Sequence, residues 1–238
     1  GGKILYQGQD LTSLNPNEIR PFRRQIQVIF QDPFASLNPR MTVGETIAEP
    51  MVVHGITDKY GASEKSVEIL KKVGLTADYA SRYPHELSGG QRQRIGIARA
   101  LAHEPNLIIA DEAVSALDVS IQAQVVNLMM ELQEEFGLSY LFISHDMAVI
   151  ERVCHRVAVM YLGEIVELGT RGQVFENPKH PYTKKLMKAV PIADPKLRKK
   201  ELNLMTDEIP SLVKPIGYEP EKIDLIKIEE GHYIKPYN

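Results

Sequence analysis

The pattern that most constrains the fold is a strand–helix–strand sequence in the middle of the chain. Residues 107–110 are all apolar, as expected of a short strand buried on both faces of a parallel sheet. Residues 119–136 form an amphipathic helical pattern that ends at Gly137, and residues 139–143 are predicted to be a second buried strand. Parallel strands need a crossover connection, so this order predicts an α/β core built on a parallel sheet.

Further elements are expected around this core. Residues 25–30 (QIQVIF) predict a strand that stops before Pro33, because proline cannot donate to the ladder. Helical patterns dominate from about residue 42 to residue 101, and Ser88 opens the last of these helices. The remaining expected elements are a short strand over 3–7, helical turns over 17–24, a helix over 63–75 that stops at Gly74, and a hairpin over 157–168 that turns at Gly163.

Composition excludes several classes of protein. The net charge of −3 does not favour a nucleic-acid binder, and a hydrophobic share of 43% is that of an ordinary globular protein. The apolar runs are much shorter than the roughly 20 residues of a membrane-spanning helix, and we expect neither a spanning helix nor a leader. Cys154 is the only cysteine, which excludes an internal disulfide and any site built from cysteines alone.

Residues 88–91 (SGGQ) have two physical readings. A serine followed three positions later by glutamine is a capping box, so Ser88 and Gln91 could simply begin a helix. Gly89 and Gly90 also leave backbone N–H groups approachable at a helix N-terminus, where the helix dipole favours an anion. The second reading makes this segment a phosphate site without a lysine.

Two adjacent carboxylates, Asp111 and Glu112, follow the apolar strand over 107–110. Side chains at the carboxyl end of a parallel strand project into the crevice where ligands bind. One carboxylate can hold Mg²⁺ through water, and its neighbour can orient or deprotonate an attacking water. The structural alternative is that the acidic pair only caps the next helix.

The order of these segments resembles that of ABC ATPases. Residues 87–101 (LSGGQRQRIGIARAL) match the signature motif of that family along their whole length, and residues 107–112 match its Walker B strand. Gln31 falls at the Q-loop, Asp118 closes a D-loop-like segment, and His145 falls at the switch histidine. The resemblance implies a P-loop NTPase (RecA-like) α/β fold: an ABC ATPase core with a helical signature subdomain and a C-terminal extension.

The resemblance also implies a role for each matching residue. Glu112 and His145 are expected to be catalytic, acting on the water that attacks the γ-phosphate. ATP and Mg²⁺ are the implied cofactors, with Gln31 and Asp111 at the metal. The residues expected to bind the nucleotide and its metal are Gln31, Ser88, Gly89, Gly90, Gln91, Asp111 and Asp118.

The chain departs from the family pattern at two points. Ala113 replaces the usual proline after the Walker B glutamate, for which we expect a small effect because both carboxylates remain. No Gly-x-x-x-x-Gly-Lys-Ser/Thr phosphate loop occurs in the 238 residues. We therefore expect an N-terminally truncated sequence that alone binds ATP poorly and is inactive.

The family pattern divides the chain into four parts. Residues 1–41 are expected to be a partial ATPase core with the Q-loop, and residues 42–104 the helical signature subdomain. Residues 105–175 would complete the core with Walker B, the D-loop and the switch histidine. Residues 176–238 are expected to be a C-terminal extension of the oligopeptide type, with little core of its own.

Two segments resemble the subfamily that energises oligopeptide and dipeptide uptake, namely residues 31–41 (QDPFASLNPRM) and residues 115–124 (SALDVSIQAQ). The His-Pro-Tyr element at residues 180–182 resembles the C-terminal region of the same subfamily. Nickel importers and some sugar importers share these features and remain alternatives. Lysines and Arg198 crowd residues 179–200, either as a solvated face or as a surface for anionic lipid or a partner.

The resemblance further implies partners. Two ATPase subunits, identical or different, pair head to tail, so that residues 88–90 serve the nucleotide of the partner. Transmembrane permease subunits and, indirectly, an extracytoplasmic solute-binding protein are implied, with the chain peripheral at the cytoplasmic face of the membrane and no nucleic acid bound. A soluble ABC protein of DNA repair or translation is less favoured, because no long coiled-coil insertion is present. An inert subunit that only completes a partner's site is the remaining alternative.

Overall fold

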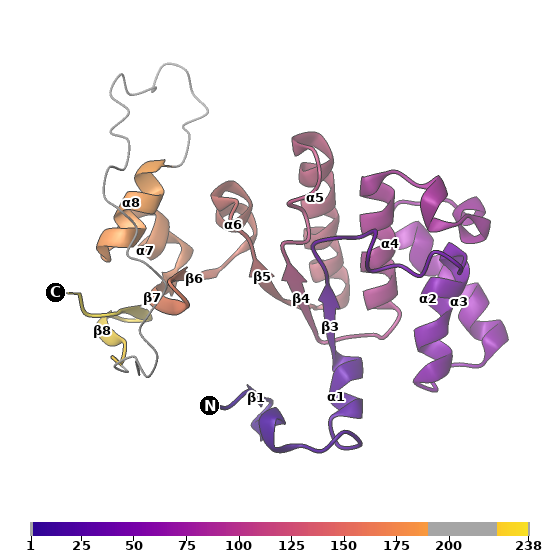
Figure 1. Ribbon diagram of the computed structural model, residues 1–238, viewed down its shortest axis with the longest axis horizontal. Helices are drawn as coiled ribbons and strands as arrows, with labels where there is room; N and C mark the ends of the chain where they lie inside the picture. The colour runs from indigo at the N-terminus through magenta and orange to yellow at the C-terminus, as the bar shows by residue number, and fades with distance from the viewer. Residues whose placement is uncertain (1, 190–222, 238) are drawn as a thin grey trace, which may run out of the picture. The chain divides into compact units, whose positions relative to one another are not determined.

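The computed structural model describes residues 2–189 and 223–237, which divide into a first unit, Gly1–Val149, and a second unit, Ile150–Asn238 (Figure 1). The helix α6 (Met147–Val153) crosses the boundary between them. The first unit contains β1 (Leu5–Tyr6), β2 (Gln9–Asp10), the 3₁₀ helix η1 (Leu11–Ser13), α1 (Arg20–Gln25), β3 (Ile26–Ile29), α2 (Val43–Val53), α3 (Lys59–Lys72), η2 (Ala77–Ser81), η3 (Pro84–Glu86), α4 (Gly89–Leu101), β4 (Leu107–Asp111), α5 (Val119–Phe136) and β5 (Ser139–Ile143). The second unit contains β6 (Arg156–Tyr161), β7 (Glu164–Thr170), α7 (Arg171–Glu176), α8 (Pro181–Ala189), β8 (Ile226–Glu229) and β9 (His232–Ile234).

A parallel sheet of three strands, in the order β3-β4-β5, forms the centre of the first unit (Figure 1). The helix α5 connects β4 to β5, and its bounds agree with the predicted helix over 119–136. Asp118 caps its N-terminus, and Gly137 ends it in the left-handed region at φ 64°, which glycine adopts without a Cβ clash. The predicted α/β core is confirmed.

The expected burial of β4 and β5 was wrong. In β4, Ile108 and Ala110 are fully buried, but Leu107 and Ile109 are only half-buried. In β5, which lies at the edge of the sheet, Leu141 is 52% exposed. Successive side chains of a strand point to opposite faces, and in the described residues only one face of this sheet is closely covered. An apolar run identifies a strand but does not show that both faces are covered.

The predicted helical region between residues 42 and 101 consists of α2, α3, two 3₁₀ helices and α4, and α4 packs against both β3 and α5. A capping box between Thr42 and Glu45 begins α2. The helix α3 begins at Lys59, earlier than the predicted start at residue 63, because the Asp58 side chain caps it through the Gly61 amide. Its end before Gly74 is as predicted.

The second unit is built on an antiparallel sheet of four strands, in the order β6-β7-β9-β8. The predicted hairpin over 157–168 is confirmed as β6 and β7, with its turn at Leu162 and Gly163. The C-terminal strand β9 pairs with β7, so the end of the chain shares the sheet of this hairpin. The four-part division of the chain stays a prediction, and residues 190–222 of the expected extension, with half of its basic cluster, lie outside the described residues.

None of the helices in the described ranges 2–189 and 223–237 combines the length and the hydropathy needed to cross a membrane.

Candidate functional site

Three predicted site residues meet at the carboxyl ends of the strands of the parallel sheet. Gln31 follows β3, Glu112 follows β4 and His145 follows β5, and parallel strands place their carboxyl ends together. The Gln31 Nε2 atom donates a hydrogen bond of 2.7 Å to Glu112 Oε2. The His145 Nδ1 atom lies 3.4 Å from the other carboxylate oxygen, Oε1. The Glu112 carboxylate is therefore the point at which all three strand ends converge.

The backbone of Glu112 is held in an uncommon conformation. Its φ of 47° lies in the left-handed region, which a residue with a Cβ adopts only at some cost in energy. Its N–H donates to the Ile143 carbonyl at 2.9 Å, and its own carbonyl accepts hydrogen bonds from the N–H and the hydroxyl of Ser115. Ala113, at the position of the usual proline, is buried beside it. These contacts fix the direction in which the Glu112 side chain leaves the strand.

Asp111 ends β4 and is exposed, paired in register with Ile143. Among the described residues, no group of three or more His, Cys, Asp or Glu side chains could by itself hold a metal ion. Magnesium commonly uses one or two carboxylates together with water and substrate phosphates, so an exposed carboxylate at this edge suits it. Gln31 uses its amide nitrogen on Glu112, which leaves the amide oxygen as the group that suits a metal.

The SGGQ segment begins α4 through a complete capping box. The Gln91 N–H donates to Ser88 Oγ at 3.3 Å, and the Ser88 N–H donates to Gln91 Oε1 at 2.9 Å. The Gln91 Nε2 atom also donates to the Tyr79 hydroxyl at 2.9 Å. The side chain of Gln91 therefore holds the segment in place, and the backbone of the first turn is the part open to an anion.

Gly90 is required by a close approach between helices. A Cβ at this position would lie 2.5 Å from Ile121 Cγ2 in the first turn of α5. A Cβ at Gly89 would lie at an ordinary 3.7 Å from Leu117. The signature segment thus packs against the start of α5, whereas Gln31, Glu112 and His145 form a separate cluster.

Asp118 is the N-cap of α5. Its Oδ1 atom accepts hydrogen bonds from Ser120 Oγ at 2.7 Å and from the Ile121 N–H at 3.0 Å. The hydrogen bonds from Ser120 and from the Ile121 amide lower the pKa of the Asp118 carboxyl below its ordinary value. A role for this side chain toward a nucleotide stays a prediction.

Sequence reasoning missed two side chains that connect the site to its surroundings. The Gln122 Nε2 atom in α5 donates a hydrogen bond of 2.7 Å to Asp146 Oδ2, in the residue directly after His145. An aspartate after a strand and before a helix is a recognisable N-cap signal for Asp146. No local signal identifies Gln122 as its partner, because the two residues are 24 positions apart.

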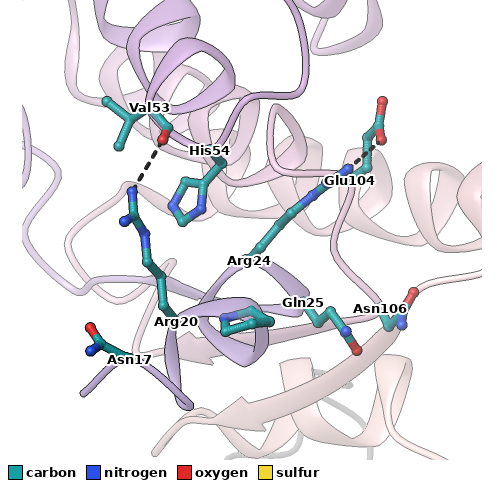
Figure 2. A pocket seen from close by; sticks show the side chains of 9 residues that line it. Asn17, Arg20, Arg24, Gln25, Val53, His54, Glu104 and Asn106 are labelled. Atoms are coloured by element: carbon teal, nitrogen blue, oxygen red, sulfur yellow. Dashed lines mark hydrogen bonds and ion pairs between the residues drawn. The ribbon is translucent and has the colours of Figure 1, made fainter.

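A pocket at the amino ends of the strands of this sheet is a poor candidate for chemistry (Figure 2). It is lined by Gln25, before β3, and Asn106, before β4, with two arginines from α1. Figure 2 shows both arginines engaged: Arg20 donates to the Val53 carbonyl at 3.3 Å, and Arg24 pairs with Glu104 at 3.0 Å. These contacts join α1 to the helical region, so the pocket is best explained as a structural joint.

Two family profiles match the chain. The profile described as "ABC transporter" matches residues 1–115, and the profile described as "Oligopeptide/dipeptide transporter, C-terminal region" matches residues 166–217. The second match includes the His-Pro-Tyr element and much of the predicted C-terminal extension.

Curated relatives extend well beyond the matched part. The glutathione import ATP-binding protein GsiA of Pectobacterium atrosepticum is 57% identical over 233 residues, which are 98% of this chain and 37% of that protein. The protein of the same name from Escherichia coli K12 is 55% identical over 234 residues, which are 98% of this chain and 38% of that protein. The chain thus spans less than two fifths of the length of these relatives.

Solved structures of ABC cassettes share the fold. The dimeric structure of MJ0796, a bacterial ABC transporter cassette, is 30% identical, with a TM-score of 0.64 over 72% of this chain and 74% of that chain. A post-hydrolysis structure of the same cassette, bound to ADP and Pi, is 29% identical with a TM-score of 0.64 over the same shares. The family profile, the sequence identity and the shared fold together place this chain in the ABC transporter ATP-binding cassette family.

Proposed function

We propose that this chain is part of an ATP-hydrolysing subunit of an ABC importer, with Glu112 as the residue that acts on the attacking water. The observation that carries the proposal is the convergence of Gln31 and His145 on the Glu112 carboxylate. A carboxylate whose orientation is fixed by neighbours can orient a water and accept its proton. The family's structure with ADP and Pi supports hydrolysis as the reaction.

The neighbouring residues have complementary roles in this proposal. Magnesium, when bound with ATP, neutralises charge on the phosphates. The exposed Asp111 carboxylate and the Gln31 amide oxygen would hold that ion. His145 would lie beside the γ-phosphate and steady the water. Its side chain is 71% exposed and its contact with Glu112 is long, at 3.4 Å, so the imidazole can take a new hydrogen-bond partner.

The signature segment would act on the nucleotide of a second ATPase subunit. Ser88, Gly89 and Gly90 begin a helix whose first-turn N–H groups and dipole favour an anion. Gly89 and Gly90 lie beside Leu117 and Ile121, at the start of α5. A paired arrangement, supported by the dimeric cassette of the family, would bring each signature to the partner's phosphates.

The 238 residues contain no phosphate loop, so we expect that loop to come from outside them. Without it, the described edge of the sheet offers carboxylates and an imidazole but no lysine to hold the β- and γ-phosphates. We therefore expect the isolated chain to bind ATP weakly and to be inactive. Tight ATP binding by the isolated chain, measured by calorimetry, would contradict this part of the proposal.

Peptides are the favoured cargo of the importer. The curated relatives are named for import of glutathione, which is a small peptide, and the C-terminal profile is that of oligopeptide and dipeptide transporters. Permease subunits and, indirectly, an extracytoplasmic solute-binding protein would be the partners, with the chain at the cytoplasmic face of the membrane. Nickel or a sugar is the alternative cargo, which transport assays with each solute would distinguish.

The central test uses a polypeptide in which this chain follows a Gly-x-x-x-x-Gly-Lys-Ser/Thr segment, called here the loop-bearing polypeptide. Glu112→Gln should lower its ATP hydrolysis by about 10²–10⁴-fold, the range for loss of a general base, and leave ATP binding intact. Glu134→Gln, at an exposed position of α5, is the matched control and should hydrolyse ATP at the original rate. Unchanged turnover in Glu112→Gln would remove the role assigned to Glu112. A catalytically inert subunit is the second candidate function, favoured if the loop-bearing polypeptide itself shows no hydrolysis.

A further inference from the structure

A side-chain hydrogen bond ties the segment that carries His145 to α5. Asp146 Oδ2 accepts a hydrogen bond of 2.7 Å from Gln122 Nε2. The other carboxylate oxygen, Oδ1, accepts from the Ala148 N–H at 2.9 Å and the Val149 N–H at 3.3 Å. Asp146 therefore joins the first turn of α6, immediately after His145, to α5.

The contacts of His145 itself are weak by comparison. Its side chain is 71% exposed, and its contact with Glu112 is 3.4 Å long, beyond the usual range of a strong hydrogen bond. Its neighbour Asp146 is half-buried and makes well-formed bonds, including one from its own N–H to Ser144 Oγ at 3.0 Å. The position of the imidazole is thus set mainly by the segment on either side of it.

Gln122 occupies a particular place in α5. It lies in the first turn, where its N–H donates to the Asp118 carbonyl at 2.8 Å. The residue before it, Ile121, fills the space that a Cβ at Gly90 would need. The first turn of α5 therefore contacts the signature segment on one side and holds the His145 segment on the other.

We propose that Gln122 is a positioning residue. Through Asp146 it sets the position of His145 relative to Glu112. It also links that position to the first turn of α5, which packs against the signature segment. The inference rests on the proposed function, because it assigns Gln122 to the hydrolytic site. An amide suits this position because it offers an N–H to the Asp146 carboxylate, whereas a glutamate of the same shape would oppose two carboxylates.

The structural alternative is that Asp146 only caps α6 and that Gln122 only satisfies a half-buried carboxylate. The two readings differ in what they predict for ATP hydrolysis. A purely structural pair would change the stability of the fold and leave the catalytic constant of the folded fraction unchanged. A positioning pair would change the catalytic constant and leave KM for ATP nearly unchanged, because the Gln122 side chain bonds to Asp146, which is not among the residues expected to bind ATP.

The test measures kcat and KM for ATP in the loop-bearing polypeptide. Gln122→Glu should lower kcat by about tenfold or more, the effect of losing one hydrogen bond to a charged group, with KM within about twofold. Asp146→Asn should lower kcat less, because the Gln122 amide can turn so that its oxygen accepts from the new amide, and a neutral hydrogen bond is weaker than one to a carboxylate. Gln124→Glu adds the same charge at an exposed position of the same helix and is the matched control.

The decisive variant combines Gln122→Glu with Asp146→Asn. The new amide at position 146 would then donate to the carboxylate at position 122 while its oxygen still accepts from the Ala148 and Val149 N–H groups, so kcat should recover. Recovery supports the inference even if either single variant folds poorly. Unchanged kcat in Gln122→Glu, or a loss that the double variant does not recover, overturns it. Loss of hydrolysis in Glu112→Gln alongside normal Gln122→Glu would leave the proposed function standing and remove only this inference.

Discussion

Two glutamate–histidine pairs in this chain have the same chemistry and opposite surroundings. In the first unit, Glu112 and His145 lie 3.4 Å apart at the edge of the parallel sheet, with side chains 29% and 71% exposed. In the second unit, Glu167 and His232 lie 2.8 Å apart and are completely buried. We call them the open pair and the closed pair.

The closed pair has its hydrogen-bonding capacity committed to the fold. Glu167 accepts hydrogen bonds from the N–H of Lys179 at 2.8 Å, from the N–H of His180 at 2.9 Å and from His232. These donors come from the segment before α8 and from β9, so one carboxylate holds both against β7. The His-Pro-Tyr element, which begins at His180, is thereby given a structural role.

The difference in burial and hydrogen bonding indicates which pair is available to react. A reacting group must exchange partners with a substrate or a water, and a partly exposed carboxylate can do so. A buried carboxylate that already accepts three N–H bonds can release them only by unfolding its surroundings. Loss of the closed pair should therefore change stability, and loss of the open pair should change hydrolysis.

The largest expected effect is that of His232→Ala. The substitution removes one of the three hydrogen bonds that the buried Glu167 carboxylate accepts and opens a cavity, for an expected loss of about 3–5 kcal/mol of stability. The urea midpoint followed through the amide resonances of β7 and β9 measures it. The exposed His155 provides a control in the same unit, and His155→Ala should leave the midpoint almost unchanged. A small effect of His232→Ala would show that the closed pair is not what holds β9.

The same substitution at both acids makes the comparison sharper. Glu167→Gln places an amide N–H₂ among N–H donors, and one unsatisfied buried donor costs about 1–3 kcal/mol. Glu112→Gln keeps an oxygen for the Gln31 amide and stays partly exposed, so its urea midpoint should hardly move. Equal destabilisation by the two substitutions would show that the surroundings do not separate the pairs.

The contrast between these pairs also shows what could be predicted from sequence. The bounds of α5 and β5 followed from local signals, a capping aspartate and a terminal glycine around a periodic apolar pattern. Gln31, Glu112 and His145 could be grouped because each follows a parallel strand and because their order resembles that of a known family. Strand order and the family resemblance together therefore group the residues of the open pair.

The closed pair could not be found in the same way. Glu167 and His232 are 65 positions apart, and a glutamate in a hairpin strand gives no sign of being buried. The pairing of β9 with β7 is likewise a long-range contact that periodicity does not encode. The overestimated burial of β5 has the same cause, since coverage of a sheet face depends on segments distant in sequence.

A further prediction concerns the stability of the second unit at acid pH. Burial lowers the pKa of the His180 imidazole, whose Nδ1 accepts the Tyr182 N–H at 3.2 Å in its neutral form; the nearby Glu167 charge opposes this shift, and Lys235 adds to it. Burial alone would raise the pKa of Glu167, but hydrogen bonds from Lys179, His232 and His180 lower it below its ordinary value. The unfolded chain therefore binds more protons than the folded chain at both groups, and stability must fall as pH falls.

In the second unit, the loss should begin below the ordinary histidine value of 6.5 and continue below the ordinary glutamate value of 4.5. Urea midpoints of β7 and β9 between pH 8 and pH 4 measure it. His180→Gln should flatten the upper part of the profile, because it removes the group that titrates there. An unchanged profile in His180→Gln would show that another group causes the upper loss.

The smallest expected effect on stability is that of His145→Ala, and it completes the comparison. The side chain is 71% exposed and makes one long contact, so its removal should change the free energy of unfolding by no more than about 0.5 kcal/mol. Urea unfolding read through β4 and β5 measures this change. In the loop-bearing polypeptide the same variant should lower ATP hydrolysis, because the imidazole is expected to steady the attacking water. A variant that loses stability and keeps its hydrolysis would show that the open pair is structural, like the closed pair. Side-chain exposure would then not identify the pair that takes part in the reaction.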